Sequence, residues 1–333
     1  MLLTPWLVFV VSALIVVYAA LKLAEFGDVI AVRTNLGGLI VGTIFLAAAT
    51  SLPELIASVS AFAEGEPDLA AGNFFGSNMV NVLLLALIDL INFRVPLLRR
   101  MAITHTLTAV LSSLLMLLAV IFIMAEVDLL IGWVGVDSLV LVALYFGGTW
   151  LIQQESQAAG GQSAIAAVVD PEFPGLATGV AGFGLSALLL VVTVPQMVGA
   201  SVSIADITGL GTGFIGTALL SIVTSLPELI AAMAAVRMGA FDLAVGNLFG
   251  SSVFNMLALG LADFLYLEGR FLGAIEPTFA LVGLLGLLLI NMALLANLAR
   301  IERKVLFIEL DAVAIILVYL AGLYLLFLRG AGA

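Results

Sequence analysis

The octapeptide TSLPELIA occurs twice in the chain, as Thr50–Ala57 and as Thr224–Ala231, at an offset of 174 residues (224 − 50). At the same offset, the longer stretches Gly42–Asp89 and Gly216–Asp263 align without a gap and share 26 identical residues of 48. Apolar matches arise by chance in a chain this rich in Leu and Ala, but a repeated pattern of Thr, Ser, Pro, Glu, Gly and Asn does not. The pattern therefore indicates an internal duplication.

A second polar pattern follows in each copy. Gly72–Asn81 reads GNFFGSNMVN and Gly246–Asn255 reads GNLFGSSVFN, so both have the form Gly-Asn-x-Phe-Gly-Ser-x-x-x-Asn. Small residues four apart are typical of close helix packing in membranes. We interpret four glycines in this way: Gly72, Gly76, Gly246 and Gly250.

The composition is that of an integral membrane protein. Of the 333 residues, 63% are hydrophobic and 10% are charged, which leaves too little polar surface to cover a water-soluble globule. The net charge of −11 argues against nucleic acid as a partner, because no basic run could neutralise phosphates. The chain has no cysteine and one histidine, so any metal ion must be held mainly by oxygen atoms. Neither a cofactor nor a protein partner is indicated, and no nucleophile–base pair suggests an enzyme.

Apolar runs of about 20 residues, enough for a helix to cross a bilayer core of roughly 30 Å, predict an all-α membrane protein with ten transmembrane helices. The only long polar connection, 153–174, is predicted to be a cytoplasmic linker between a first five-helix repeat, 1–152, and a second, 175–333. The predicted helices lie near residues 4–24, 37–62, 68–91, 101–124, 128–152, 175–199, 209–236, 242–265, 277–298 and 306–328.

The basic residues predict the orientation of the chain. With the N-terminus outside, nine Lys and Arg residues fall on the inner side and two, Arg270 and Arg329, on the outer side, as the positive-inside rule requires. Both termini are thus expected outside a prokaryotic inner membrane. The two copies begin in the second and seventh helices, so they enter the bilayer from opposite sides. Such inverted repeats are typical of secondary transporters with a site near the bilayer midplane.

Glu54 and Glu228 are predicted to lie near the middle of the membrane. A charged side chain there costs about 2.5–3.5 kcal/mol on insertion scales, which makes both carboxylates candidates for function. The alternative is a structural ion pair, but residues 34–93 contain no Lys or Arg, and the second copy has only Arg237 at its end. A proton or a cation is therefore predicted to supply the compensating charge.

Pro53 and Pro227 directly precede these two glutamates. A proline inside a helix removes the hydrogen bond to the carbonyl four residues back. Main-chain carbonyls in Ala47–Ala49 and Ser221–Val223 are therefore predicted to be free to bind a cation. Proline kinks also occur for purely structural reasons, so the signal gains its weight from the adjacent glutamate and from its repetition.

Side chains four residues apart share a helix face, which places Thr50 with Glu54 and Ser77 with Asn81. Two carboxylates combined with neutral hydroxyl, amide and carbonyl oxygens suit a hard cation, and calcium fits best. Together with the inverted copy, eight side chains are predicted to converge: Thr50, Glu54, Ser77, Asn81, Thr224, Glu228, Ser251 and Asn255.

Other polar residues receive simpler interpretations. His105 has no counterpart in the duplication and is expected to be a packing or surface residue. Asp89 and Asp263 match across the copies but lie near helix ends, so we expect them to be capping or solvated residues. Asp137 and Asp311 are left without a role.

The doubled motif resembles that of the sodium/calcium exchangers of the cation/calcium antiporter superfamily, in particular their prokaryotic members. The resemblance covers both repeats and implies that Thr50, Glu54, Thr224 and Glu228 bind calcium. It implies that the first and sixth helices slide as a gate across the core. It also implies that sodium is bound by Ser51, Ser77, Ser225 and Ser251 and by the main-chain carbonyls of Ala47 and Ser221. To these we add Asn81 and Asn255 as ligands of sodium or of both ions.

This chain departs from the family at one point. Such exchangers often carry an aspartate at one of the positions matching Asn81 and Asn255, whereas this chain has asparagine at both. The expected function is exchange of calcium for sodium by alternating access, with proton-coupled antiport as the alternative. A passive cation channel is a further alternative, which inverted repeats with broken helices disfavour.

Overall fold

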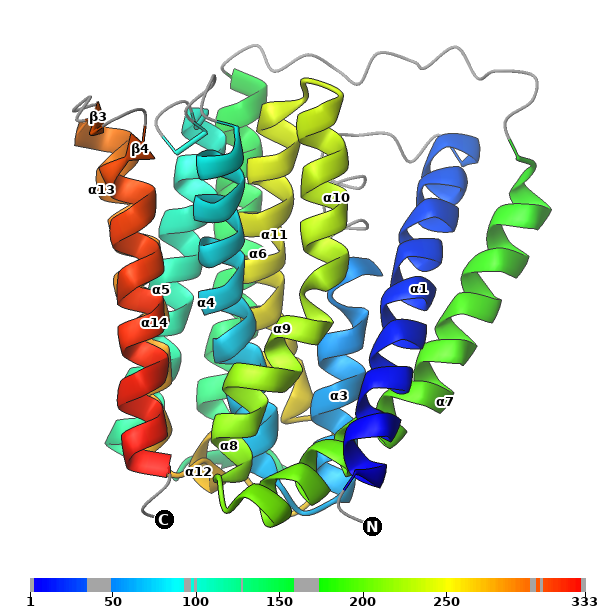
Figure 1. Ribbon diagram of the computed structural model, residues 1–333, viewed down its shortest axis with the longest axis vertical. Coiled ribbons are helices and arrows are strands. Elements are labelled where there is room, and N and C mark those ends of the chain that lie inside the picture. The colour runs from blue at the N-terminus through cyan, green and yellow to red at the C-terminus, as the bar shows by residue number, and fades with distance from the viewer. Residues whose placement is uncertain are drawn as a thin grey trace.

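Long apolar helices make up most of the computed structural model (Figure 1). It describes residues 3–34, 49–92, 97–98, 101–126, 128–158, 174–299, 304–305 and 308–330. Within these ranges, nine helical segments are long and apolar enough to cross a membrane. They are α1 (Thr4–Arg33), α4 (Pro67–Ile91), α5 (Ile103–Ala125), α6 (Val136–Ala158), α7 (Leu176–Thr208), the broken segment Thr212–Arg237, α11 (Phe241–Ala262), the segment Pro277–Ala299, and α14 (Leu310–Gly330).

Shorter elements complete the described chain. The broken segment consists of α8 (Thr212–Ile215), the π-helix η1 (Gly216–Leu220), α9 (Ser221–Thr224) and α10 (Leu226–Arg237). The segment ending at Ala299 consists of the 3₁₀-helix η2 (Pro277–Phe279) and α13 (Ala280–Ala299). The remaining elements are α3 (Leu52–Ala63), α12 (Phe271–Ala274) and two antiparallel hairpins, β1 (Leu130–Ile131) with β2 (Val134–Gly135) and β3 (Lys304–Val305) with β4 (Ile308–Glu309).

The protein is thus a mostly helical membrane protein, and several predicted boundaries were wrong. The first helix continues past 24 to Arg33, because Lys22 pairs with Glu25 at 2.6 Å on its surface and the charges need not end it. Likewise α7 continues past 199 to Thr208. The fifth and tenth helices begin later than predicted, at Val136 and Leu310, because a hairpin precedes each. The first part of the predicted helix 37–62 lies outside the described residues.

Two helices form the centre of the bundle. α4 and α11 are the most deeply buried of the nine segments, and they pack against each other. α3 packs on α4, and α10 packs on α11. α1 and α7 run side by side along most of their length at one flank of this core (Figure 1). The core therefore carries the repeated polar motifs, and the α1–α7 pair stands beside it.

The short turns between the motif helices have the same geometry in both copies. Gly65 and Gly239, which are 174 residues apart (239 − 65), both adopt φ +76°. The following residue donates its N–H back to the helix in both turns, from Glu66 to Ala61 and from Ala240 to Ala235, each at 2.9 Å. Only glycine takes this left-handed conformation without strain, which explains why it recurs at this position.

The paired aspartates cap loops at the other end of α4 and α11. Asp89 Oδ1 accepts the N–H of Leu97, and Asp263 Oδ1 accepts the N–H of Phe271, each at 2.5 Å. Both aspartates are buried, so the capping interpretation is confirmed and the solvated one is wrong. Asp137, left without a role above, forms a buried ion pair with Arg270 at 3.3 Å.

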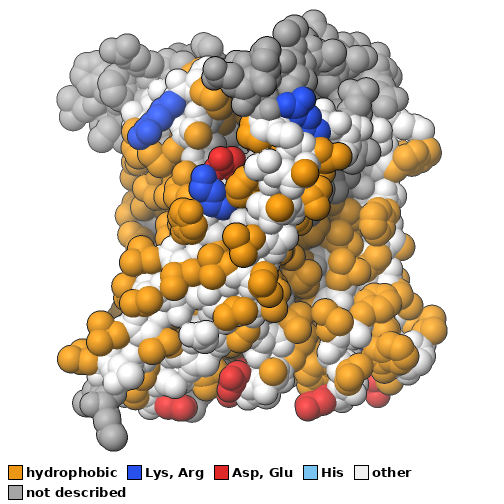
Figure 2. All heavy atoms as spheres, turned by 90° about the vertical axis from the view of Figure 1, so that its right-hand side faces the viewer, with side chains coloured by type: hydrophobic (Ala, Val, Ile, Leu, Met, Phe, Trp, Pro, Cys, Tyr) orange, Lys and Arg blue, Asp and Glu red, His pale blue; other side chains and the backbone are white. Residues whose placement is uncertain are grey.

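Charge is distributed unevenly between the two ends of the bundle. α1 begins and α14 ends at the same end (Figure 1). On the face shown in Figure 2, Lys and Arg side chains lie in the upper half, whereas most Asp and Glu side chains line the lower edge, where α1 begins. The two ends of the bundle thus differ in the sign of charge on this face.

The equivalent turns permit a direct test of orientation. Glu64 and Met238 are exposed residues 174 positions apart (238 − 64) that directly precede Gly65 and Gly239. If the copies are inverted, Glu64→Cys should react with a membrane-impermeant maleimide in intact cells, whereas Met238→Cys should react only after permeabilisation. The cysteine-free parent chain is the control. Labelling of both cysteines from the same side would exclude the inverted arrangement.

Candidate cation-binding site

The two glutamates lie at breaks between helices rather than inside continuous ones. Ser51 and Ser225 leave the helical conformation with nearly identical angles, φ −91° and ψ 6° for the first and φ −87° and ψ 1° for the second. A new helix starts after each break with proline in its first turn, where the missing N–H has no intrahelical partner to lose. Glu54 and Glu228 therefore lie in the first turns of α3 and α10, where the helix dipole favours a negative charge.

This arrangement changes the prediction made for the main-chain carbonyls. The carbonyl of Ser221 accepts the N–H of Ser225 at 3.0 Å and the hydroxyl of Thr224 at 3.3 Å. The expectation that it lies free of hydrogen bonds is wrong, because the break residue Ser225 still bonds back one turn. Ala47, its counterpart in the first copy, lies outside the described residues.

Both carboxylates are completely buried, but their surroundings differ. Glu228 Oε1 accepts hydrogen bonds from Ser251 at 3.0 Å and from Ser51 at 3.4 Å, and these two hydroxyls are 2.7 Å apart. Glu228 Oε2 and both carboxylate oxygens of Glu54 accept no hydrogen bond from the described part of the chain. Of the four carboxylate oxygens, one thus accepts hydrogen bonds from the described residues and three accept none.

Each carboxylate lies beside side chains of both copies. Ser77 and Thr224 lie beside Glu54, and their hydroxyl oxygens are 3.4 Å apart. Thr50 takes the equivalent position beside Glu228. The charges of the two glutamates also act on each other. The structure thus brings the predicted Thr, Ser and Glu residues into one cluster between the copies.

The two motif asparagines tie the copies together with their nitrogens and keep their oxygens open. Asn81 Nδ2 donates to Ser252 Oγ at 3.2 Å, and Asn255 Nδ2 donates to Asn78 Oδ1 at 3.1 Å. Position 252 matches 78 across the offset (252 − 174), so the two bonds cross between equivalent positions. Asn81 Oδ1 and Asn255 Oδ1 have no donor among the described residues.

The cluster is rich in buried acceptors that lack donors. Buried polar atoms in proteins are nearly always satisfied, and an unsatisfied one costs about 1–3 kcal/mol. Among the described residues, no Lys, Arg or His forms an ion pair with Glu54 or Glu228, and no third His, Cys, Asp or Glu joins them. Such a set can be satisfied by a proton or by a cation that accepts oxygen ligands. The open atoms are Glu54 Oε1 and Oε2, Glu228 Oε2, Asn81 Oδ1, Asn255 Oδ1 and Ser225 Oγ.

Sequence reasoning missed two asparagines beside the site. Asn73 Nδ2 donates to the main-chain carbonyl of Glu54, and Asn247 Nδ2 donates to that of Glu228, each at 3.3 Å. Both belong to the repeated Gly-Asn pair, so their repetition was a usable signal. A partner on the main chain cannot be read from the sequence.

Close packing brings α4 against η1. A Cβ atom at Gly76 would lie 2.8 Å from both Thr217 Cα and Thr217 O, and one at Gly72 would lie 2.4 Å from Gly213 O. The packing interpretation of these two glycines is therefore confirmed. π-helical turns are frequent at functional sites, and this one precedes the break that carries Thr224 and Glu228.

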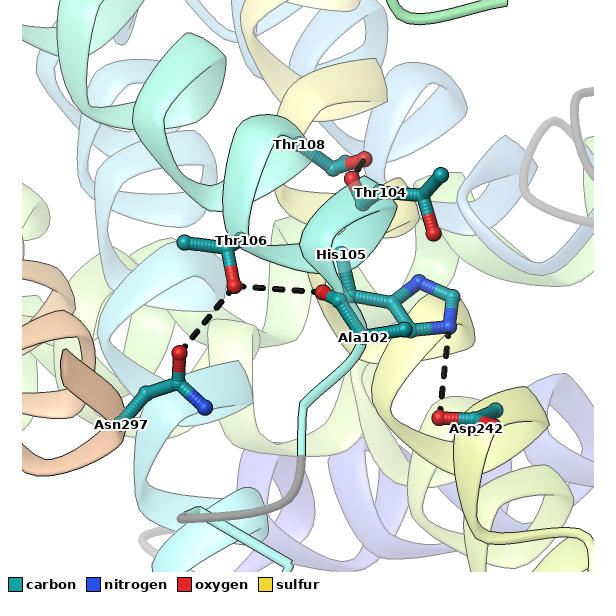
Figure 3. Close-up of polar contacts among 7 residues, drawn as sticks. All are labelled: Ala102, Thr104, His105, Thr106, Thr108, Asp242 and Asn297. Carbon is teal, nitrogen blue, oxygen red and sulfur yellow. Dashed lines mark hydrogen bonds and ion pairs between the residues drawn. The ribbon is translucent and has the colours of Figure 1, made fainter. Parts of the chain in front are cut away.

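His105 lies at the start of α5 and packs against α11 (Figure 3). A Cβ atom at Gly246 would lie 2.8 Å from its imidazole Cε1, and its Nε2 lies 4.0 Å from Asp242 Oδ1. Beside it, Thr106 Oγ1 contacts Asn297 Oδ1 at 3.2 Å and the carbonyl of Ala102 (Figure 3). The packing role expected for the histidine is confirmed.

The chain is similar to several known proteins. The model of the family described as sodium/calcium exchanger protein matches residues 4–152 and 178–328. Inner membrane protein YrbG of Escherichia coli K12 is 29% identical over 264 residues, which cover 76% of this chain and 77% of YrbG.

Solved exchangers share the fold. An H⁺/Ca²⁺ exchanger, CAX, superimposes with a TM-score of 0.68 at 17% identity, covering 97% of this chain and 88% of CAX. The sodium-calcium exchanger NCX_Mj superimposes with a TM-score of 0.61 at 17% identity, covering 97% of this chain and 99% of NCX_Mj. At this level of identity the two structures establish the fold and leave the coupling ion open.

The packing of α4 on η1 can be tested through stability. In Gly76→Ala, the new methyl group would overlap main-chain atoms of Thr217, so we expect a loss of about 1–3 kcal/mol and a lower Tm in detergent. The matched control is Gly147→Ala on α6, where a Cβ atom meets nothing within 4 Å. Equal melting temperatures for the two variants would contradict the close approach.

Proposed function

The chain belongs to the sodium/calcium exchanger protein family, and from this premise we propose that it is a secondary antiporter that exchanges calcium for sodium at the cluster around Glu54 and Glu228. One observation carries the proposal. Two buried carboxylates and several open oxygen atoms, contributed by both copies of the motif, meet in the most deeply buried part of the bundle without a basic partner among the described residues.

The ligand types favour calcium as one of the exchanged ions. Calcium accepts six to eight oxygen ligands from carboxylates, amides, hydroxyls and carbonyls in flexible geometry. Two carboxylates neutralise its charge. In this proposal Thr50, Glu54, Thr224 and Glu228 bind calcium. Sodium uses the same carboxylates together with the neutral oxygens of Ser51, Ser77, Asn81, Ser225, Ser251 and Asn255 and the carbonyl of Ala47. The carbonyl of Ser221 is left out of this set, because it accepts hydrogen bonds from Ser225 and Thr224.

Alternating access follows from the arrangement of the two copies. If the copies are inverted, Glu54 and Glu228 lie at similar depth and become accessible from opposite sides. The α1–α7 pair packs along the flank of the core, where it is placed to move relative to α4 and α11. In this proposal its displacement opens the cluster to one side at a time, with both termini outside a prokaryotic cell membrane.

Proton-coupled exchange of calcium is the second candidate. Both carboxylate oxygens of Glu54 lack a donor among the described residues, and a bound proton would satisfy one of them as well as a cation would. The fold is compatible with either ion, because it is shared with CAX and with NCX_Mj. The two candidates differ only in the counter-ion.

Neutralising one carboxylate should stop transport. In Glu54→Gln or Glu228→Gln, a single negative charge remains to balance a divalent ion in a buried site, so calcium flux in proteoliposomes should fall to background. Glu64→Gln provides a matched control, since it removes a carboxylate that is exposed in the α3–α4 turn. Flux near the parent rate in either buried variant, with intact protein, would show that this glutamate is not a ligand.

Charge balance at the site also predicts the electrical behaviour. Two glutamates are neutralised by one calcium or by two sodium ions, and the amides of Asn81 and Asn255 add no further charge. We expect sodium and calcium to compete, with little charge moved per cycle. Calcium flux against opposing sodium gradients, with the membrane potential clamped by potassium and valinomycin, should then reverse at the same gradient at every potential.

Two other outcomes of this experiment are informative. A reversal point that shifts with voltage as one net positive charge moving with sodium per cycle requires would establish exchange of three sodium ions and exclude the two-ion cycle. Calcium flux driven by a pH gradient in the absence of sodium would establish the proton-coupled candidate instead.

A further inference from the structure

We propose that Asn73 is a positioning residue that orients Thr224 toward the bound ion, and that it couples the two copies of the motif at the site. This inference rests on the proposed function, because it concerns the same cluster. It adds a residue whose side chain is not itself a ligand of the ion.

Asn73 lies where the first copy packs against the second. Its side chain is fully buried on α4, one turn before Ser77. A Cβ atom at Gly216 would lie 3.2 Å from the main-chain nitrogen of Asn73 and 2.5 Å from the carbonyl of Leu69. Asn73 therefore lies where α4 packs closely against η1 of the second copy.

Two partners orient the side-chain amide of Asn73. Asn73 Nδ2 donates to the main-chain carbonyl of Glu54 at 3.3 Å, and Asn73 Oδ1 faces Thr224 Oγ1 at 3.2 Å. A carbonyl oxygen can only accept, so the nitrogen must be the end that faces Glu54. The oxygen must then face Thr224, whose hydroxyl has to donate.

The contact with Asn73 sets the direction of the Thr224 hydroxyl. A hydroxyl has one proton and two lone pairs. Its proton is directed to Asn73 Oδ1 at 3.2 Å, for which the carbonyl of Ser221 at 3.3 Å is the competing acceptor on the same side. The lone pairs are thus left for the side that faces Glu54 and the ion. Partners of this kind, which orient a ligand without touching the metal, typically change metal affinity by about 10–100-fold.

Asn247, the equivalent of Asn73 in the second copy, supports the main chain alone and so serves as a comparison. Asn247 donates to the carbonyl of Glu228 at the same 3.3 Å, but its Oδ1 has no donor among the described residues. The carbonyl of Glu54 has another donor, Ser58 Oγ at 2.9 Å, whereas position 232 is alanine in the second copy. Ser58 thus holds the Glu54 main chain without contacting Thr224.

The experiment measures calcium binding to the purified full-length protein by isothermal titration calorimetry. Asn73→Leu removes both hydrogen bonds, and we expect a rise in Kd of about tenfold or more. Ser58→Ala removes only the second donor to Glu54, and its Kd should stay within about twofold of the parent, within the ordinary scatter of a single hydrogen bond. A parent protein that binds no calcium would refute the proposed function, whereas an unchanged Kd in Asn73→Leu would refute only this inference.

A double-mutant cycle distinguishes orientation of Thr224 from general damage. In the background of Thr224→Val, which has no hydroxyl to orient, Asn73→Leu should add little further loss of affinity. Asn247→Leu combined with Thr224→Val should instead give additive losses. Additive losses for the Asn73 pair would overturn the proposal.

A shorter replacement guards against misfolding. If Asn73→Leu does not fold, Asn73→Ser provides the same comparison with less bulk, and its Kd should rise in the same direction. Failure of both Asn73 variants to fold, while Asn247→Leu and Asn247→Ser fold, would assign Asn73 to stability and overturn the positioning role.

Discussion

The structure depends on two buried carboxylates that the described residues leave without a positive partner. In a low-dielectric interior, a pair of like charges without compensation is strongly unfavourable. The hydroxyls around Glu228 and the helix N-termini beneath both glutamates reduce this cost, because they offer hydrogen bonds and a favourable dipole. They cannot cancel two full charges. A mobile cation or proton is therefore needed to neutralise the two carboxylates. A site that is neutral only when an ion or a proton is bound is suited to transport.

Much of the site could be predicted from the sequence because the duplication separates function from composition. Glu54 and Glu228 could be identified as acidic residues near the middle of the membrane. The separation of four residues then predicted that Thr50 lies with Glu54 and Thr224 with Glu228. The structure brings these four residues into one cluster but exchanges the pairs, with Thr224 beside Glu54 and Thr50 beside Glu228, because the break at Ser51 or Ser225 separates each threonine from the glutamate four residues on. The predominance of long helices also follows from the long apolar runs of the sequence.

What escaped prediction depends on main-chain geometry. The prolines were expected to kink continuous helices, but each starts a new helix after a break at Ser51 or Ser225, and so the carbonyl of Ser221 is not free. The hairpins before α6 and α14 are too short for strand periodicity to reveal, and the surface pair Lys22–Glu25 conceals the continuation of α1. Asn73 and Asn247 donate to main-chain carbonyls, and the amino-acid sequence does not reveal which carbonyl lies beside a side chain. These features are set by contacts between distant segments.

The crossed amide bonds between α4 and α11 constrain how this chain could evolve a third negative charge at its centre. An aspartate at position 81 would give up a donor to Ser252, whose own hydroxyl already donates to Leu248. At position 255 the neighbour is Asn78, whose Nδ2 has no acceptor in the described part of the chain. Rotation of that one amide by half a turn would present an N–H donor to a carboxylate. The two equivalent positions thus differ in how they could accept an added negative charge. At position 255 a neighbouring amide can rotate to donate to it, whereas at position 81 a hydrogen bond has to break.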